Sequence, residues 1–198
     1  MLTKFLQSLS DRPSSSIVYN QYKSKHAINN LHVFFEIMLE HHHDVLLIGE
    51  APGYRGCRLT GIPFTSGTVI QNSQHQIFNQ IRNKIMLPKL ETEPTATVFW
   101  EFFGTDRTVP ILWNAFPFHP HLLGNPESNR KPKHSEIDEG KNYLIMLNDI
   151  FRPKKLCSLG RVGQSILSEL FPKSNIIYIR HPSHGGKKKF INGMSKLY

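Results

Sequence analysis

Four short and almost continuously apolar runs constrain the fold of this chain more than any other feature. They cover residues 44–48, 109–116, 155–159 and 175–180, and each ends in residues that favour loops. An apolar run of this length, without polar alternation, is typical of a parallel strand buried on both faces. The runs therefore predict a parallel β-sheet at the centre of the molecule.

Segments with apolar residues at helical spacing accompany these runs. They cover residues 26–40, 69–86, 135–151 and 162–171. In the third segment Ser135 is the expected N-cap, and Asp138 stands three residues later in place of the usual Glu or Gln. Strands that alternate with helices imply right-handed crossovers between parallel strands.

The order of these segments predicts an α/β fold, namely a single-domain αβα sandwich around a four-stranded parallel sheet. A length of 198 residues suits one globular domain that spans residues 1–198. Residues 1–43 are expected to form an N-terminal helical region, to which no role is assigned.

Polar side chains gather in the loops that follow the predicted strands. In open parallel sheets ligands bind outside the carboxyl ends of the strands. Glu50, Asn114 and His181 all stand at such positions. Ordinary turn formation explains the Gly and Pro residues of these loops, but it does not explain the three polar residues together.

Several common catalytic and metal-binding patterns are absent. The loop after residue 48 has neither the phosphate-binding Gly-x4-Gly-Lys pattern nor Gly-x-Gly-x-x-Gly, and the chain has no Gly-x-Ser-x-Gly elbow. Cys57 and Cys157 are too few for a thiolate metal site. We interpret the histidines at 41–43 as a helix C-terminus, and His119 and His121 lack a carboxylate or cysteine nearby. Neither a metal nor another cofactor is predicted.

Three segments, in this order along the chain, resemble the uracil-DNA glycosylase superfamily. The first is Gly49-Glu50-Ala51-Pro52-Gly53, followed by Gly61-Ile62-Pro63-Phe64. The second is Asn114, followed by a Pro-rich stretch and Asn129-Arg130-Lys131-Pro132, and the third is His181-Pro182-Ser183. The nearest branch is the iron–sulfur thermophile type. That branch holds its cluster with four cysteines and this chain has two, so no cluster is expected.

The resemblance runs from about residue 44 to residue 195 and implies a uracil-DNA glycosylase-like fold. It also implies a DNA glycosylase that hydrolyses the N-glycosidic bond of uracil or a related deaminated base, as in base excision repair. His181 would donate a hydrogen bond to uracil O2 as negative charge develops there. Glu50 would orient or activate the attacking water or stabilise the sugar cation. These two residues are the expected catalytic pair.

The resemblance also implies a base pocket. Phe64 would stack on the flipped base, and Asn114 would read uracil O4 and N3–H with one amide. Gly49 and Ala51 would let the backbone approach the base closely. Each residue has a simpler alternative: Phe64 as core, Asn114 and Glu50 as partners of loop backbone, and His181 as a structural residue beside proline.

Positive charge is concentrated near the third motif. All of the net charge of +9 comes from residues 152–198, where Glu169 is the single acidic residue. Such a bias indicates a polyanion partner, although a solubilising surface is the simpler alternative. The residues expected to contact the DNA backbone are Ser183, Gly185, Gly186, Lys187, Lys188, Lys189 and Arg130, with Lys131 and Lys133 as further basic neighbours.

One departure from the family leaves other functions open. In active relatives the loop after the third motif often carries an apolar wedge, whereas here no apolar residue precedes Phe190. A catalytically inactive or diverged nucleic-acid-binding protein is therefore an alternative, and an enzyme acting on a free nucleoside or nucleotide is a third. The longest apolar runs are far shorter than a membrane span, and no signal peptide is visible. A cytoplasmic monomer that binds DNA and no membrane is expected.

Overall fold

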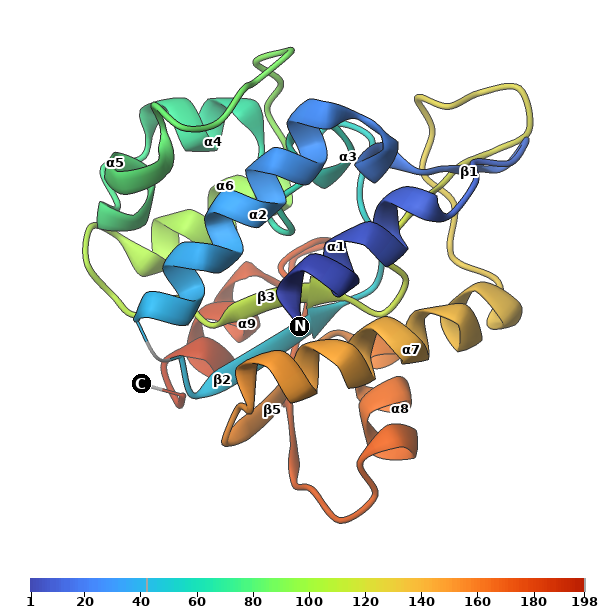
Figure 1. Ribbon diagram of the computed structural model, residues 1–198. Helices are drawn as coiled ribbons and strands as arrows, with labels where there is room; N and C mark the ends of the chain where they lie inside the picture. Colours follow the sequence, from blue (N-terminus) through green and yellow to red (C-terminus); the bar gives the residue numbers. More distant parts are fainter. Residues whose placement is uncertain (42, 198) are drawn as a thin grey trace.

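The computed structural model describes residues 1–41 and 43–197, and a four-stranded parallel sheet lies at its centre (Figure 1). The strand order is β3-β2-β5-β6. The strands are β2 (Val45–Gly49), β3 (Ile111–Asn114), β5 (Lys155–Leu159) and β6 (Ile176–Ile179). The predicted parallel sheet is confirmed, although β3 is shorter than predicted. Pro110 has no N–H to donate to a ladder, which is consistent with a strand that begins after it.

The register of the strands brings their carboxyl ends to one edge of the sheet. Gly49 pairs with Asn114 across β2 and β3, and Leu159 pairs with Ile179 across β5 and β6. Hydrogen bonds continue past the end of β3, because the Ala115 N–H donates to Gly49 O and the Phe116 N–H to Glu50 O. The loop after β2 is therefore fixed against the loop after β3.

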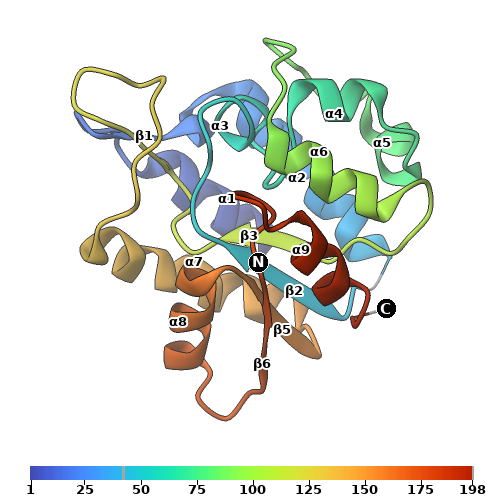
Figure 2. The same ribbon diagram turned by 180° about the vertical axis from the view of Figure 1, so that it is seen from behind.

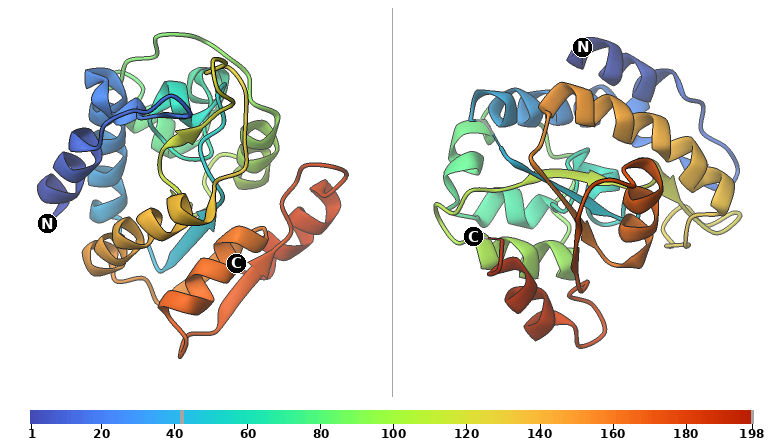
Figure 3. Two further views of the ribbon diagram at one scale, coloured as in Figure 1. Left: turned by 90° about the vertical axis from the view of Figure 1, so that its right-hand side faces the viewer. Right: turned by 90° about the horizontal axis from the view of Figure 1, so that it is seen from below.

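Helices cover both faces of the sheet, which confirms the predicted αβα sandwich. In Figures 2 and 3, α1, α2 and α7 lie over one face and α6 and α9 over the other. A short antiparallel pair, β1 (Val18–Tyr19) with β4 (His119–Pro120), lies outside the main sheet. The helices are α1 (Leu2–Asp11), η1 (a 3-10 turn, Gln21–Lys23), α2 (Lys25–Glu40), α3 (Cys57–Thr60), α4 (Gly67–Asn72), α5 (Gln76–Ile81), α6 (Pro94–Phe103), α7 (His134–Phe151), α8 (Arg161–Leu170) and α9 (Lys187–Met194).

The single helix predicted over residues 69–86 is wrong, because the chain breaks into α4 and α5. Ser73 has extended backbone at the end of α4. His75 then begins α5, and its Nδ1 accepts the Ile77 N–H at 3.2 Å. The apolar spacing continues across this break, so periodicity alone could not reveal it.

The predicted N-cap at Ser135 is also wrong. Helix α7 begins at His134, and Lys133 occupies the N-cap position. The Glu136 carboxylate accepts the Lys133 N–H at 2.7 Å, and it also pairs with Arg130. Because Arg130, which lies before the helix, holds the Glu136 carboxylate in this position, the helix begins earlier than predicted, at His134.

The N-terminal helical region belongs to the main core. Phe5 of α1 is fully buried and packs edge-on against Trp113 of β3, with ring centroids 5.3 Å apart. The Asn20 side chain donates to the carbonyls of Leu9 and Arg12, and so joins the end of α1 to the segment before η1. The region is therefore part of the layer over one face of the sheet. No helix among the described residues has the length and apolar character to cross a membrane.

Candidate active site

A cleft of about 550 Å³ opens at the carboxyl edge of the sheet, and the loops after all four strands line it. The four residues that carried the sequence prediction, which are Glu50, Phe64, Asn114 and His181, all face this cleft. They come from three parts of the chain that are far apart in the sequence, namely the segment after β2, the end of β3 and the segment after β6. The predicted convergence of these side chains on one cavity is thus present in the structure.

Phe64 is held in a fixed position against α6. Its ring stacks on Phe99 with a centroid separation of 5.2 Å, and its carbonyl accepts the Trp100 Nε1–H at 2.9 Å. Its backbone has φ of 55°, in the left-handed region that non-glycine residues rarely adopt. The strained backbone turns the ring toward the cleft, and the contact with Phe99 covers its other face.

Gly49 lets Phe64 and Asn114 lie next to each other. A Cβ atom on Gly49 would come within 2.4 Å of Phe64 Cζ and 2.9 Å of Asn114 Oδ1. Real Cβ atoms do not approach other atoms this closely, so any larger residue would displace the ring, the amide or both. A glycine is required at position 49 because the Phe64 and Asn114 side chains lie too close for a Cβ atom, and not because the backbone there forms a turn.

Asn114 ends β3 and is only 4% exposed. Among residues 1–41 and 43–197, no group forms a hydrogen bond with its side-chain amide. Buried amides are normally hydrogen-bonded, and one that faces a cavity without a partner suits a ligand. The alternative in which Asn114 holds loop backbone is not supported by the geometry.

His181 is fixed by the residue two positions later. Its Nδ1 lies 3.2 Å from the Ser183 backbone N–H, which donates to it, and 2.7 Å from Ser183 Oγ. Burial, assisted by the charges of Arg180 and His184, lowers the pKa of His181 to about 4. The ring is therefore neutral at pH 7, and with Nδ1 accepting, its proton lies on Nε2. A neutral imidazole of this tautomer presents one N–H donor.

Glu50 lies at the exposed rim of the cleft. Burial raises the pKa of its carboxyl group, and the positive charge of Lys131 opposes that rise. Within the described chain no loop amide donates to this carboxylate, so the simpler alternative of loop capping is not supported. An ionised carboxylate without a protein partner can accept a proton from a water molecule.

The basic residues after the third motif occupy the first turn of α9, not a loop. Lys187, Lys188 and Lys189 are exposed there, and Lys187 pairs with Glu101 at a distance of 2.7 Å. Phe190 is fully buried against Phe99 and Phe102, so it faces the core and not the solvent.

The glycines before α9 differ from each other. Gly185 is exposed with φ of 71°, whereas Gly186 is buried and its N–H already donates to Ser183 O at 3.1 Å. A Cβ on Gly186 would lie 2.1 Å from His181 O. Gly186 therefore shapes the turn that holds His181, and its amide has no free proton for a phosphate.

The Arg130 side chain is held in place by hydrogen bonds within the protein. Its guanidinium forms two hydrogen bonds with Glu136, at 2.8 and 2.9 Å, and donates to the carbonyls of Ile17 and His121. Bidentate pairing of this kind holds the side chain in place. Arg130 thus fixes the loop before α7, and because it also lines the cleft, its contact with a DNA phosphate stays a prediction.

Two cations at the cleft had no role in the sequence prediction. Arg161 begins α8 and Arg180 precedes His181, and both line the cleft. Arg161 directly follows the Gly160 turn at the end of β5. The rule that ligands bind at the carboxyl ends of parallel strands could therefore have pointed to Arg161 in the sequence. With Lys131, these residues place three positive charges on the lining of the cleft, which also carries the carboxylates of Glu50 and Glu93.

His119 joins two loops beside the cleft. Its Nδ1 lies 2.8 Å from Pro52 O and its Nε2 lies 3.1 Å from Pro126 O. Both nitrogens therefore face backbone oxygens. Among residues 1–41 and 43–197 no group of three or more metal-ligating side chains occurs. Of the histidines at 41–43, His41 ends α2 as its C-cap, and His42 lies outside the described residues.

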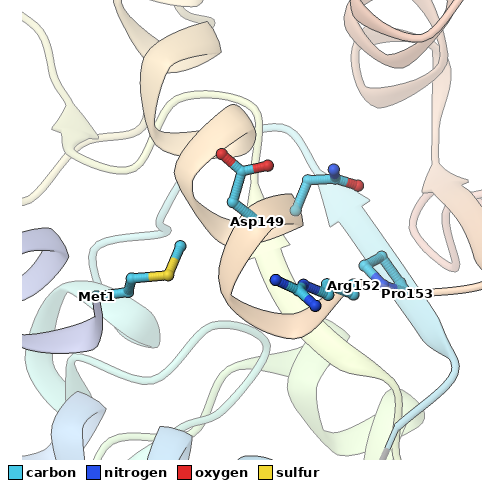
Figure 4. Close-up of a pocket in the computed structure, with 5 residues that line it drawn as sticks. Met1, Asp149, Arg152 and Pro153 are labelled. Atoms are coloured by element: carbon cyan, nitrogen blue, oxygen red, sulfur yellow. The ribbon is translucent and has the colours of Figure 1, made fainter.

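A second depression lies near the opposite edge of the sheet (Figure 4). It has a volume of about 410 Å³ and is lined by Met1, by Asn148 and Asp149 at the end of α7, and by Arg152 and Pro153. These last residues lead into the amino end of β5. None of the predicted site residues lies there.

Comparison with known families identifies the fold. Residues 38–193 match the model of the uracil DNA glycosylase superfamily. The chain belongs to this superfamily. The match includes all three motifs on which the resemblance was based, and it begins within α2. No curated protein matches the chain.

Among solved structures, the superfamily fold is also found in the crystal structure of wild-type SMUG2 from Pedobacter heparinus. The two structures superpose with a TM-score of 0.66 at 16% sequence identity, over 98% of this chain and 95% of that chain. At this identity the likeness establishes the fold. Because nearly the whole chain is covered, the superposition extends to the N-terminal residues that precede the family match.

Proposed function

We propose that the protein removes uracil, or a related deaminated base, from DNA by hydrolysing the N-glycosidic bond. The observation that carries this proposal is the unpartnered Asn114 amide, which lies beside the Phe64 ring in the cleft that also holds neutral His181. This combination offers a stacking surface, a donor–acceptor pair for a base edge and a donor for a leaving group. Membership of the superfamily supports the same chemistry.

The proposed reaction begins with a flipped nucleotide, because its base is not accessible inside the stack. The base lies on Phe64, with its O4 and N3–H on the Asn114 amide. As the bond between C1′ and N1 breaks, the bonding electrons move into the base and negative charge develops at O2. The Nε2–H of His181 donates to that oxygen and lowers the energy of the leaving group.

Water completes the reaction at the sugar. The water oxygen forms the new bond to C1′, and the Glu50 carboxylate accepts the water proton. The base leaves as an anion that solvent protonates, and an abasic site remains in the DNA. Lys131, Arg161, Lys188 and Lys189 support binding of the phosphate backbone, and this contribution weakens as salt concentration rises.

The direct test uses oligonucleotides with a single uracil, in single-stranded form and paired with guanine or adenine. We expect release of free uracil and an alkali-labile abasic site in at least one of these substrates. The same oligonucleotides with thymine in place of uracil are the control. Absence of product from every uracil substrate, with enzyme in excess, would refute the proposal.

A non-catalytic nucleic-acid-binding protein is the second candidate. It is favoured by the segment from His184 to Lys189, which carries no apolar side chain. This candidate predicts binding to oligonucleotides whose affinity falls steeply with salt concentration, without release of any base. The assay above, combined with a salt titration of binding, distinguishes the two.

The pH dependence of base release is a further prediction. Glu50 must be ionised, so the rate is full above its pKa and falls as pH drops through it; burial raises this pKa from 4.5. His181, with a pKa of about 4, is already neutral and adds no step near the usual histidine value of 6.5. We therefore expect a flat profile between about pH 7 and pH 8 and a decline in the acidic range.

The Glu50→Gln variant is the control for this profile. It should be slower than the wild type and should lose the acidic decline, which single-turnover rates over the same pH range would show. A decline centred near pH 6.5 that persists in this variant would contradict the assignment.

A further inference from the structure

Two exposed leucines stand at the tip of the loop that follows β4. Leu122 is 53% and Leu123 is 74% exposed. By contrast, Phe190, the first apolar residue after the third motif, is fully buried. Exposed apolar side chains contribute nothing to the core, and two in succession at a loop tip suit contact with a partner.

The turn that carries these leucines is well hydrogen-bonded. The Asn125 N–H donates to Leu122 O at 3.0 Å, and Ser128 Oγ accepts the Leu122 N–H at 2.9 Å. The Glu127 N–H donates to Asn125 Oδ1 at 3.2 Å, and Gly124 supplies the left-handed residue of the turn with φ of 72°. The leucines are therefore presented on a closed turn.

The same turn is connected to the cleft. His119 lies between Pro52 O and Pro126 O, and Asn129 Oδ1 accepts the Tyr54 N–H at 3.1 Å. The loop thus contacts the segment that follows Glu50 at two points. Figure 3 (left), which looks onto the carboxyl edge of the sheet, shows the loop beside that segment.

We propose that Leu122 and Leu123 enter the base stack of duplex DNA next to the flipped nucleotide. This inference rests on the proposed function and assigns to this turn the wedge that the segment after His181 lacks. Apolar side chains inserted between bases replace part of the stacking that is lost when a nucleotide leaves the helix. The leucines would therefore matter for duplex substrates and not for single strands.

DNA is the partner that the surroundings favour. Lys131 and Lys133 are exposed later in the same loop, and Arg161 and Arg180 line the adjoining cleft. These four positive charges outnumber the single acidic side chain of the turn, Glu127, and they complement a phosphate backbone that flanks stacked bases. Two leucines alone would cover too little area for a stable protein–protein interface.

The test compares wild type with the double variant Leu122→Ala/Leu123→Ala. We expect uracil release from duplex DNA to fall by roughly 10-fold or more, because two leucine side chains lose their burial in the complex. Release from single-stranded DNA should stay within about twofold, since no base must be unstacked from a partner strand. The matched control is Ile145→Ala, an equally apolar side chain that is 43% exposed on α7.

A second readout separates this inference from the proposed function. A duplex with 2-aminopurine next to an abasic-site analogue reports unstacking as a rise in fluorescence. Wild type and Ile145→Ala should give this rise, and the double leucine variant should not. If no uracil is released at all, the proposed function fails while the fluorescence still decides the role of the leucines. Equal losses on single and double strands, or a rise in fluorescence with the double variant as large as that with the wild type, would overturn the inference.

Discussion

The His181→Ala variant is expected to release uracil roughly 10²–10³-fold more slowly than the wild type, because it removes the donor that we propose stabilises the leaving base. The loss should appear in the single-turnover rate and not in the affinity for DNA. The reason is that negative charge on O2 develops only as the bond breaks, so the hydrogen bond is stronger in the transition state than in the ground state. Rate and affinity are measured with a uracil duplex and a duplex carrying an abasic analogue, respectively.

Two variants serve as controls for His181. His134 is a highly exposed histidine at the start of α7, and His134→Ala should leave the rate unchanged. Ser183→Ala removes the hydroxyl 2.7 Å from His181 Nδ1 but keeps the backbone N–H that donates to the same nitrogen. Its rate should lie between those of the wild type and His181→Ala. A His181→Ala rate within about threefold of wild type would exclude a role in leaving-group stabilisation.

The sheet and the location of the candidate site were predictable from the sequence because both depend on the strand pattern. Parallel strands buried on both faces leave almost unbroken apolar runs, and their carboxyl ends meet at one edge by topology. Glu50 directly follows β2, Asn114 ends β3, and His181 stands two residues after the end of β6. Their meeting in one cleft therefore required only that the order of strands and helices be read correctly.

Features that depend on contacts between distant residues were not predictable. Arg130 looks like a free cation in the sequence, but its role is set by Glu136 and by carbonyls that include Ile17 O. The sequence places Phe190 at the end of the loop after the third motif. In the structure it belongs to α9, which turns its ring onto Phe99, so it cannot act as a wedge. The break between α4 and α5 depends on the local hydrogen bond of His75, which the apolar spacing does not encode.

The orientation of His181 belongs to the same class of features. The sequence shows a serine two residues after the histidine, but only the structure shows that the Ser183 N–H occupies Nδ1 and thereby leaves the proton on Nε2. The exposure of Leu122 and Leu123 was equally hidden, since two adjacent leucines in a sequence are more often buried.

The Gly49→Ala variant should lose base release by roughly 10²-fold or more while it keeps the fold. The added Cβ would lie 2.4 Å from Phe64 Cζ and 2.9 Å from Asn114 Oδ1, so the ring and the amide must move apart. A displacement of about 1 Å at a reacting site is enough for a loss of this size. The unfolding free energy should also fall, by about 1–3 kcal/mol, as is usual when a packed site is overfilled.

Gly53→Ala is the matched control, because it adds the same methyl group four residues later in the same motif. The nearest atom to a Cβ at Gly53 is Asn129 Oδ1 at 4.0 Å, an ordinary contact, so activity and stability should stay close to wild type. The double variant Gly49→Ala/Phe64→Ala relieves the contact with the ring. It should regain part of the lost stability without regaining activity, because the stacking surface for the base is gone. If Gly49→Ala instead matches wild type in both rate and thermal unfolding, the juxtaposition of Phe64 and Asn114 is not what forms the base pocket.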